Sequence, residues 1–428
     1  MLQAGNVRTA VFNYLFARKH GGKFIVRIED TDKERSKKEY EENILDTLKW
    51  LRFEYDEFYR QSDNIERHKK ALEDLLARDL IYISKETPTE EGQRTEVVRF
   101  RNPNTTITFT DVIRGPITID TTDLGDFIIG RSMEDPLYHF GVVVDDFDEG
   151  VTHVIRGEDH ISNTPRQILI QRALGASEPP IYAHLPLVLG TDKSKLSKRK
   201  GAKAITQYRD EGYLPEAMVN YLALLGWHPH DEQEIFTVAE LIEAFDLARI
   251  QKGGGVFDET KLKWFNQEHI KRLSPEAFAD RLRAFMKEKG EDLPAFFPSV
   301  AKILQDRVQT LEEARDALAT EFDFIDQTVA YNKELLLKGA KAEASAVLGY
   351  LTKVIEILGE LSDESFTNEG VKDAIFPYAT EVGRSAVLWP MRVALSGKEK
   401  SPDPFTLASL LGKEKTLTRL NKAVAVLK

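Results

Sequence analysis

Apolar positions early in the chain switch between helical and strand-like spacing. Residues 7–17 repeat apolar side chains at the helical period, which predicts a helix. The pair Gly21-Gly22 follows, and glycine ends helices because it adopts the left-handed C-terminal conformation without steric penalty. Residues 24–28 predict a buried strand, and helical patterns cover residues 38–51 and 65–78. This alternation indicates an open, mostly parallel sheet with helices on both faces.

From about residue 80 to residue 138 the pattern changes to short β-type segments separated by turn residues. These segments lie at residues 97–100, 106–109, 117–119 and 127–129. We therefore expect a small antiparallel or mixed β insertion between two halves of an α/β domain.

After this insertion the strand–helix alternation resumes. We expect strands at residues 140–144, 151–155 and 185–189 and a helix near residues 165–174. Beyond residue 205 nearly every segment has helical spacing, and residues 300–428 are predicted to form an all-helical bundle.

Composition narrows the class of protein. The 428 residues suggest about three domains. Cysteine is absent, which excludes disulfides, Cys-ligated zinc, iron–sulfur clusters and thiol nucleophiles. No apolar run approaches the roughly 18 residues of a membrane helix, and residues 1–10 do not resemble a signal peptide, so we expect an intracellular, cytoplasmic protein with no membrane contact. The net charge of −11 argues against bulk attraction to nucleic acid, but local basic patches remain compatible with it.

The first candidate for chemistry is Gln3-Ala4-Gly5-Asn6, which opens the first predicted helix. Glycine at a helix start lets a ligand approach the free backbone N–H groups, which favour phosphate. Taken alone, a Gly-Asn pair is more often an ordinary helix cap.

The second candidate is Arg27-Ile-Glu-Asp-Thr-Asp32, at the carboxyl end of the first predicted strand. Ligands of open parallel sheets bind outside these strand ends. The three carboxylates could hold an ammonium group, a ribose hydroxyl or a metal-bound phosphate, or they could form a solvated acidic turn before the next helix.

The third candidate is a cationic loop at residues 191–203. Against a single acidic residue, Asp192, it carries Lys193, Lys195, Lys198, Arg199, Lys200 and Lys203. Such a loop can neutralise charge that builds on a triphosphate during displacement. A surface charge run or a simple RNA-binding patch is the alternative, and the more frequent one for a loop of this kind on its own.

The order of these segments resembles that of the class I aminoacyl-tRNA synthetases, and the strings are most similar to those of the bacterial glutamyl-tRNA synthetases. The matching strings are GNVRTAVFNYLFAR at 5–18, GKFIVRIEDTD at 22–32, VIRGEDHISNTPR at 154–166, GYLPEA at 212–217, residues 256–264, and MRVALSG at 391–397. The resemblance covers almost the whole chain.

The resemblance implies an α/β fold: a Rossmann-like parallel-sheet catalytic domain with a small α+β insertion, followed by all-helical C-terminal domains. The domains expected from it are the first half of the catalytic domain at 1–79, an acceptor-end-binding insertion at 80–137, the second catalytic half with its KLSKR loop at 138–204, a helical stem-contact domain at 205–293 and a helical anticodon-binding domain at 294–428.

The resemblance also implies where ATP binds. The segment Gln3–Asn6 lies on the family's HIGH signature and Lys195–Arg199 on its KMSKS signature, with the ATP phosphates between them. Catalytic roles fall to Lys198, which would stabilise the leaving pyrophosphate, and to Gln3 and Asn6. The residues expected to bind ATP are Gly5, Asn6, Lys195, Lys198, Arg199, Glu158 and His160, although His160 is as readily a structural hydrogen-bonding residue.

For the amino acid, the resemblance implies three residues. Glu29 would receive the amino group of L-glutamate, and Tyr138 and Arg156 would hold the substrate. Arg156 would pair with a carboxylate, which its planar fork suits.

The chain departs from the family pattern in three ways. The family begins with a strand that carries an Ala-Pro-Ser-Pro-Thr-Gly stretch, whereas this chain starts inside the loop before the first helix; we expect a truncated start rather than an impaired copy. Gln3 replaces the usual histidine, and an amide can donate a hydrogen bond but cannot carry positive charge. No cysteine remains for the zinc knuckle of some relatives, so structural zinc is not expected.

The implied activity is two-step ligation of L-glutamate to tRNA(Glu), with ATP and Mg²⁺ as cofactors and tRNA(Gln) as a second candidate substrate. The protein is expected to be a monomer. Residues 391–428 hold eight basic and three acidic residues, a local balance of +5 that an anticodon loop could use, with Arg392 as the first tRNA-binding candidate. A packed helical bundle with ordinary surface lysines is the alternative for this tail.

Other functions remain open at this stage. A glutaminyl-tRNA synthetase would have a β-barrel tail, and a glutamyl-queuosine tRNA synthetase would lack the tail. A catalytically impaired or silent tRNA-binding paralogue is favoured by the absent strand and Gln3, and opposed by Glu29, Arg156 and Lys198.

Overall fold

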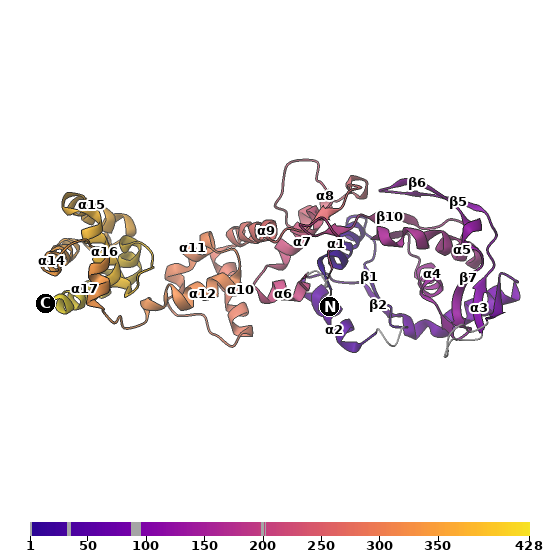
Figure 1. The fold of residues 1–428 in the computed structure, drawn as a ribbon, viewed down its shortest axis with the longest axis horizontal. Helices are drawn as coiled ribbons and strands as arrows, with labels where there is room; N and C mark the ends of the chain where they lie inside the picture. The colour runs from indigo at the N-terminus through magenta and orange to yellow at the C-terminus, as the bar shows by residue number, and fades with distance from the viewer. Residues whose placement is uncertain (1, 32–35, 87–95, 198–200, 202) are drawn as a thin grey trace. The chain divides into compact units, whose positions relative to one another are not determined.

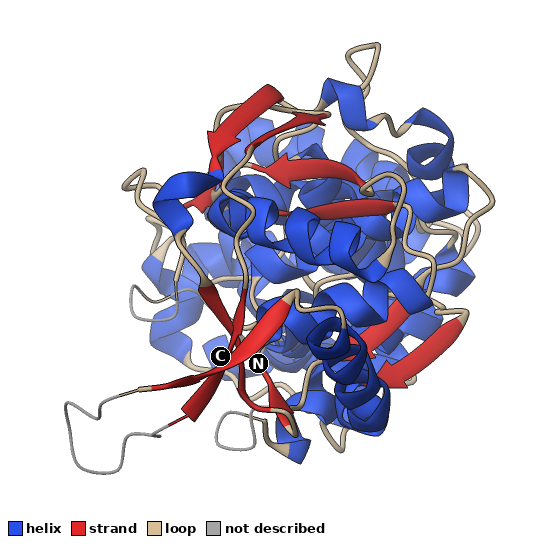
Figure 2. Cartoon of the chain, turned by 90° about the vertical axis from the view of Figure 1, so that its right-hand side faces the viewer, coloured by secondary structure: helices blue, strands red, loops and turns tan. Residues whose placement is uncertain are grey.

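The structure is a computed structural model that describes residues 2–31, 36–86, 96–197, 201 and 203–428. The chain divides into two compact units, Met1–His269 and Ile270–Lys428 (Figure 1). The strands, red in Figure 2, all belong to the first unit in the described part of the chain. Among the described residues, no helix has the length and apolar character needed to cross a membrane.

The first unit begins with an α/β arrangement. Its elements are α1 (Ala4–Lys19), β1 (Ile25–Ile28), α2 (Lys38–Trp50), β2 (Glu57–Arg60), a 3-10 turn at Gln61–Asn64 and α3 (Ile65–Ala77). Strands β1 and β2 pair in parallel. Helix α1 ends where predicted, because Gly21 takes a φ of +64° and the amide of Gly22 returns to the carbonyl of Ala17.

The following β segments belong to two sheets. The first sheet is antiparallel and contains β3 (Ile81–Lys85), β4 (Glu96–Phe100), β7 (Phe127–Ser132) and β8 (Asp135–Pro136). The second holds the hairpin of β5 (Thr106–Asp111) and β6 (Gly115–Asp120), and β5 then pairs in parallel with β10 (Ile181–Leu185). The hairpin of the predicted insertion therefore continues the sheet of the second α/β half.

That second half contains α4 (Tyr138–Asp148), β9 (His153–Gly157), a 3-10 segment at Glu158–Asn163 and α5 (Thr164–Leu174). Strands β9 and β10 are parallel, which gives the sheet the order β6-β5-β10-β9. The strand predicted at residues 140–144 is wrong: this run lies inside α4, where Phe140 to Val144 are all buried. The run at residues 185–189 is only partly a strand, since β10 ends at Leu185 and the short β11 covers Val188–Leu189.

Helices dominate the rest of the first unit, as predicted. They are α6 (Ile205–Asp210), α7 (Pro215–Leu224), α8 (Val238–Ala244) and α9 (Glu259–Arg272), with the short strand β12 (Gly255–Val256) pairing with β11. Helix α1 packs in a large apolar core with α7 and α8, centred on Phe12, Trp227 and Phe245. The same core includes the start of α1 and the end of β10, so it holds these two ends close together.

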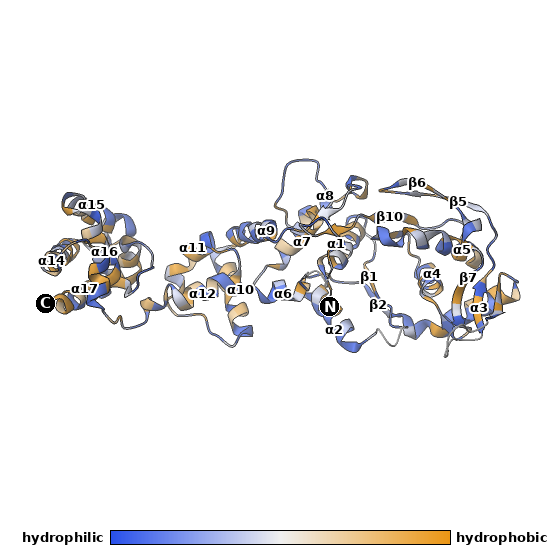
Figure 3. Ribbon diagram, in the orientation of Figure 1, coloured by the Kyte–Doolittle hydropathy of each residue, from blue (hydrophilic) through white to orange (hydrophobic). Residues whose placement is uncertain are grey.

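The second unit is helical throughout its described residues, which confirms the predicted all-helical tail. Its helices are α10 (Pro275–Glu288), α11 (Phe297–Arg307), α12 (Leu311–Thr320), α13 (Lys333–Lys338), α14 (Ala344–Glu360), α15 (Asn368–Val382), α16 (Arg384–Ser396) and α17 (Pro404–Leu427), the last kinked at Gly412. Orange and blue residues alternate along these helices in Figure 3, and α14 buries Val347, Leu351, Val354 and Leu358 at helical spacing. The domain limits inside the two units stay predictions.

Candidate active site

The start of α1 and the cationic loop meet at a cavity of about 500 Å³. Its lining includes Ala4 of α1, Lys195 and Lys203 from the loop region, and the acidic residues Asp192, Asp258 and Glu259. A bridge between Gln3 and Ala204 joins the two segments, although they are about 200 residues apart in the sequence. The structure therefore brings the first and third candidate segments together.

A buried arginine fixes this end of α1. The guanidinium of Arg8 donates to the carbonyl of Leu225 at 3.2 Å and to that of Pro186. Burial lowers the pKa of Arg8 to about 10, opposed in part by the nearby carboxylate of Glu158. The strand-end segment at Pro186 is thereby tied to the helix that starts the site.

The predicted ATP-binding residues are only partly gathered at this cavity. Lys195 lines it and forms an ion pair with Asp159 at 3.1 Å, whereas Gln3 and Gly5 adjoin the lining residue Ala4 only in the sequence. Asn6 instead lines a separate hollow of about 850 Å³ together with residues of β1 and β9. Lys198 and Arg199 lie outside the described residues.

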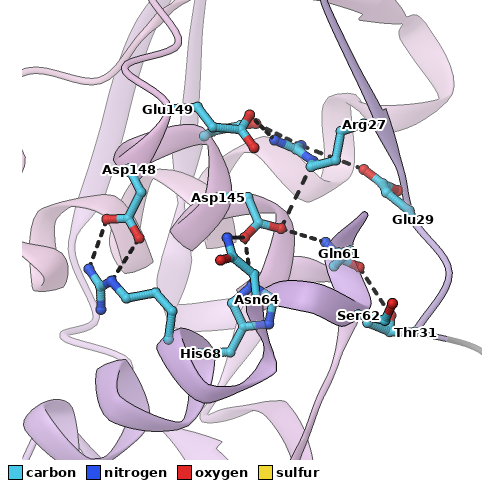
Figure 4. Close-up of polar contacts among 12 residues, drawn as sticks. Arg27, Glu29, Thr31, Gln61, Ser62, Asn64, His68, Asp145, Asp148 and Glu149 are labelled. Carbon is cyan, nitrogen blue, oxygen red and sulfur yellow. Dashed lines mark hydrogen bonds and ion pairs between the residues drawn. The ribbon is translucent and has the colours of Figure 1, made fainter. Parts of the chain in front are cut away.

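Carboxylates surround Arg27, at the carboxyl end of β1 (Figure 4). Its guanidinium lies 2.8 Å from Asp146, 2.7 Å from Glu149, 3.7 Å from Glu29 and 3.9 Å from Asp145. Burial works to lower the pKa of Arg27, but these acidic neighbours outweigh it and hold the pKa above its ordinary value. Arg27 thus links the end of β1 to α4 and holds Glu29 beside it.

Asp145 is the centre of a buried hydrogen-bond network in Figure 4. Its carboxylate accepts hydrogen bonds from Nε2 of Gln61 at 2.9 Å and Nδ2 of Asn64 at 2.9 Å, and lies 2.7 Å from Nε2 of His68. Gln61 in turn accepts from the hydroxyl of Thr31 at 3.0 Å. The acidic turn after β1 is therefore held by the hydrogen bond between Thr31 and Gln61 rather than only solvated.

The structure places Glu29 and Arg156, two of the residues expected to bind glutamate, close enough to the third, Tyr138, to act on it electrostatically. Burial, and next the carboxylate of Glu29, raises the pKa of Tyr138 to about 12, whereas the nearby Arg156 works to lower it. Burial also raises the pKa of Glu29. Both charged groups thus act on the same tyrosine, which begins α4.

Arg156 has an environment opposite to that of Arg27. Its Nε lies 3.3 Å from Nε2 of His184 and its Nη2 donates to the hydroxyl of Thr164 at 2.9 Å, while the ring of Tyr182 lies 5.6 Å away. Within the described ranges, no carboxylate forms an ion pair with it. Burial lowers the pKa of Arg156, and the nearby Tyr182, Tyr138, Asp146 and Asp111 offset this effect only in part. An anionic ligand would supply the missing charge.

Glu158 and His160 follow β9. Glu158 pairs with Arg114 and accepts from the amide of Leu187 at 2.9 Å, so its carboxylate is engaged inside the fold. The ring of His160 lies 6.1 Å from that of Tyr138, and burial, then Arg156, lowers its pKa. His160 therefore lies close to the ring of Tyr138, while Glu158 has a structural partner.

Arg392 lies on α16 in the second unit. Its Nη2 donates to the carbonyl of Glu399 at 2.9 Å, and its guanidinium stacks 4.7 Å from the ring of Trp389. Other basic residues of the tail are also engaged: Arg419 is buried on backbone carbonyls, and Lys398 pairs with Asp323. The basic residues of this tail that the structure leaves exposed are Lys400, Lys415, Lys422 and Lys428. The sequence count thus overstates the charge available to a partner.

Sequence reasoning missed Asp111, His184, Thr164 and Asp146. The first three support Arg156 from strands β5 and β10 and from the start of α5. Only the order of the strands reveals their contact, because β5 and β10 are about 70 residues apart. No group of three or more metal-ligating side chains suited to a metal ion occurs among the residues the structure describes.

Comparison with known proteins agrees with this geometry. The family described as tRNA synthetases class I (E and Q), catalytic domain, matches residues 1–96 and 85–264, and the anticodon binding domain matches residues 277–424. The parallel sheet, the helix start facing a cationic loop and the helical tail are thus those of a class I tRNA synthetase.

Individual relatives narrow the assignment. The chain is 41% identical over 461 residues to the glutamate–tRNA ligase of Geobacter sulfurreducens, covering 100% of this chain and 96% of that one. It is 40% identical to the glutamate–tRNA ligase of Aquifex aeolicus, covering 98% and 95%. A crystal structure of a glutamate tRNA ligase from Elizabethkingia meningosepticum, in complex with its amino acid, superimposes with a TM-score of 0.85 at 31% identity, covering 100% and 97%. The chain belongs to the glutamate–tRNA ligase family.

Proposed function

We propose that this chain ligates L-glutamate to tRNA(Glu) in an ATP-dependent reaction through glutamyl-adenylate. The observation that carries the proposal is the environment of Arg156, a partly buried guanidinium that forms no ion pair with a carboxylate among the described residues and acts electrostatically on Tyr138 and His160. A glutamate side chain or main-chain carboxylate supplies the missing negative charge. Glu29, held by Arg27, accepts the ammonium group of the same substrate.

Two displacements make up the reaction. The α-carboxylate of glutamate attacks the α-phosphorus of ATP and releases pyrophosphate, and a terminal ribose hydroxyl of tRNA then attacks the mixed anhydride to give glutamyl-tRNA and AMP. The protein contributes position and charge rather than covalent chemistry. Lys195 and Lys203 face the 500 Å³ cavity, where they balance phosphate charge, and Lys198 and Arg199 keep their proposed roles in the same loop.

The cavity suits a nucleoside triphosphate with its bound Mg²⁺. The N-terminal turn of α1 borders the cavity with free backbone N–H groups, which favour phosphate. Mg²⁺ binds chiefly through phosphate oxygens and one or two carboxylates, and Asp192, Asp258 and Glu259 are the acidic residues of the lining. The metal would bridge and neutralise the phosphates.

The tRNA would contact both units. We assign the acceptor end to the insertion at 80–137 and the anticodon loop to the helical tail, with Arg392 and the exposed lysines of α17 as candidates. Activation of glutamate is expected to need bound tRNA, and the enzyme is expected to act as a monomer. The second candidate substrate, tRNA(Gln), remains part of the proposal.

Glutamylation of purified tRNA with radiolabelled glutamate tests the proposal. We expect acid-precipitable label on tRNA(Glu) that requires ATP and is absent with glutamine. Parallel reactions with tRNA(Gln) decide the second substrate. Binding of tRNA without any glutamylation would overturn the proposal in favour of a silent tRNA-binding paralogue.

A further inference from the structure

A buried chain of polar side chains supports Arg156 from the neighbouring strands. His184 on β10 lies directly opposite Arg156 on β9 in the parallel register. Asp111, the last residue of β5, lies on the other side of His184, with 2.7 Å between its carboxylate and Nδ1. Both side chains of this pair are 0% exposed. Three adjacent strands thus supply one residue each to a single line of contacts.

The hydrogen bonds fix the proton on the histidine ring. The carboxylate of Asp111 also accepts from the backbone amide of His184 at 3.0 Å, and from the amides of Ile113 and Arg114 at 2.9 Å and 2.8 Å. A carboxylate that accepts from Nδ1 requires the proton on that nitrogen, so Nε2 of the neutral ring carries a lone pair. This lone pair faces Nε of Arg156 at 3.3 Å.

Thr164 completes the support. Its hydroxyl accepts from Nη2 of Arg156 at 2.9 Å and lies 3.2 Å from Nε2 of His184. Two of the three guanidinium nitrogens of Arg156 are therefore hydrogen-bonded to protein side chains. Among the described residues, Nη1 has no hydrogen-bond partner, so this nitrogen remains for a ligand.

We propose that Asp111 and His184 are positioning residues for the reaction: together with Thr164 they hold the guanidinium of Arg156 so that its open edge receives a carboxylate of glutamate. This inference rests on the proposed function of Arg156. Asp111 fixes the tautomer and the ring, His184 accepts from the guanidinium, and neither residue touches the substrate. A doubly protonated or rotated ring would turn an N–H toward Arg156 and displace it.

The proposal gives the two ring nitrogens of His184 different roles, and two amide variants test these roles one at a time. In His184→Asn the side-chain amide replaces Nδ1, so the bond to Asp111 can form but the acceptor for Arg156 is lost. In His184→Gln the amide oxygen reaches the place of Nε2 and can accept from Arg156. ATP–pyrophosphate exchange in the presence of tRNA gives KM for glutamate, KM for ATP and kcat for each variant.

We expect His184→Asn to raise KM for glutamate about tenfold, the size expected for one lost hydrogen bond to a charged group, with KM for ATP unchanged. His184→Gln should restore most of this loss. Equal KM values for the two variants, or a parallel rise in KM for ATP, would overturn the proposal.

A second pair of variants keeps the test decisive if His184→Asn does not fold. Thr164→Val removes the acceptor for Nη2 at nearly constant volume, and we expect KM for glutamate to rise selectively. Thr47→Val is the matched control, because Thr47 is buried on α2 and its hydroxyl, within the described part of the chain, bonds only to the carbonyl of Asn43 at 2.7 Å. An unchanged KM in Thr164→Val overturns the inference.

Arg156→Gln separates this inference from the proposed function. If Arg156→Gln leaves KM for glutamate unchanged, the proposed role of Arg156 fails and the positioning role fails with it. If Arg156→Gln abolishes glutamate saturation while Thr164→Val and His184→Asn have no effect, only the positioning role fails.

Discussion

Arg27 on β1 and Arg156 on β9, two strands of different sheets, show how the partners of an arginine decide its role. Arg27 has four carboxylates within 4 Å, whereas Arg156 has neutral partners only among the described residues. Arg27 is therefore a structural tie, whereas Arg156 keeps Nη1 free of hydrogen bonds to the described residues, which leaves this nitrogen for an anion. The sequence places both at the ends of strands, but only the fold shows which carboxylates reach which guanidinium.

Replacing Arg27 should destabilise the protein strongly. Arg27→Met leaves Asp146 and Glu149 buried without their counter-charge, and we expect the free energy of unfolding to fall by about 3–5 kcal/mol. Urea denaturation at pH 7 measures this change. Arg67→Met is the control, because Arg67 forms an exposed pair with Asp148 whose loss should cost under about 1 kcal/mol. Equal losses in the two variants would contradict the structural role of Arg27.

Asp145 should make stability depend on acid pH. Burial works to raise its pKa, but hydrogen bonds from His68, Gln61 and Asn64 outweigh burial and hold the pKa below its ordinary value. The stabilisation is therefore complete above the unfolded pKa of about 3.9 and is lost as the pH falls through the lower folded pKa. We expect Asp145→Asn to be less stable at pH 7, with a difference that shrinks below about pH 4. Urea denaturation from pH 3 to pH 7 checks this, and a difference independent of pH would refute it.

Helices and strands were predicted well where the apolar pattern has one clear period. The pattern of residues 7–17 correctly predicted α1, and Gly21-Gly22 its end. The run at residues 140–144 was misassigned because α4 is enclosed on nearly all sides, so its apolar residues are continuous and carry no helical period. The length of this run would not have decided between a helix and a strand, since the run is short.

The C-terminal end of α5 offers a test at this scale. Gly175 has a φ of +98°, and nothing lies within 4 Å of a Cβ added there, so Gly175→Ala would introduce backbone strain without a clash. We expect a loss of about 1 kcal/mol in the free energy of unfolding.

A glycine inside a helix provides the control of opposite sign. Gly349 lies within α14 with open space around an added Cβ, so Gly349→Ala should stabilise its unit by about 0.5–1 kcal/mol. Urea denaturation followed by circular dichroism measures both variants. Stabilisation by Gly175→Ala would contradict the assigned cap.

At the scale of the whole molecule, an acidic chain must bind a polyanion through local patches. The net charge is −11, and the structure shows that several basic residues of the tail are engaged inside the second unit. The resemblance gave the order of the segments correctly, and with it the family. It did not reveal the support of Arg156, because that depends on strands distant in the sequence becoming neighbours.

The exposed lysines of α17 should contribute to tRNA binding. We expect the double variant Lys415→Gln, Lys422→Gln to weaken tRNA binding and to reduce the slope of log affinity against log salt by about 1–2, as counterion release predicts. Lys415→Arg with Lys422→Arg keeps the charge and should bind as the unchanged protein does. Filter binding across a range of salt concentrations measures both, and identical slopes would remove α17 from the interface.

The most direct test of the central claim is glutamate saturation of tRNA-dependent ATP–pyrophosphate exchange in the unchanged protein and in Arg156→Gln. We expect saturable exchange with glutamate in the former, and at least a hundredfold rise in KM for glutamate in the latter, because a charged partner of the substrate carboxylate is lost. KM for ATP should stay nearly unchanged, and the urea midpoint should fall less than in Arg27→Met, since Arg156 forms no ion pair with a carboxylate among the described residues. Exchange that saturates at the same glutamate concentration in both proteins would contradict the account.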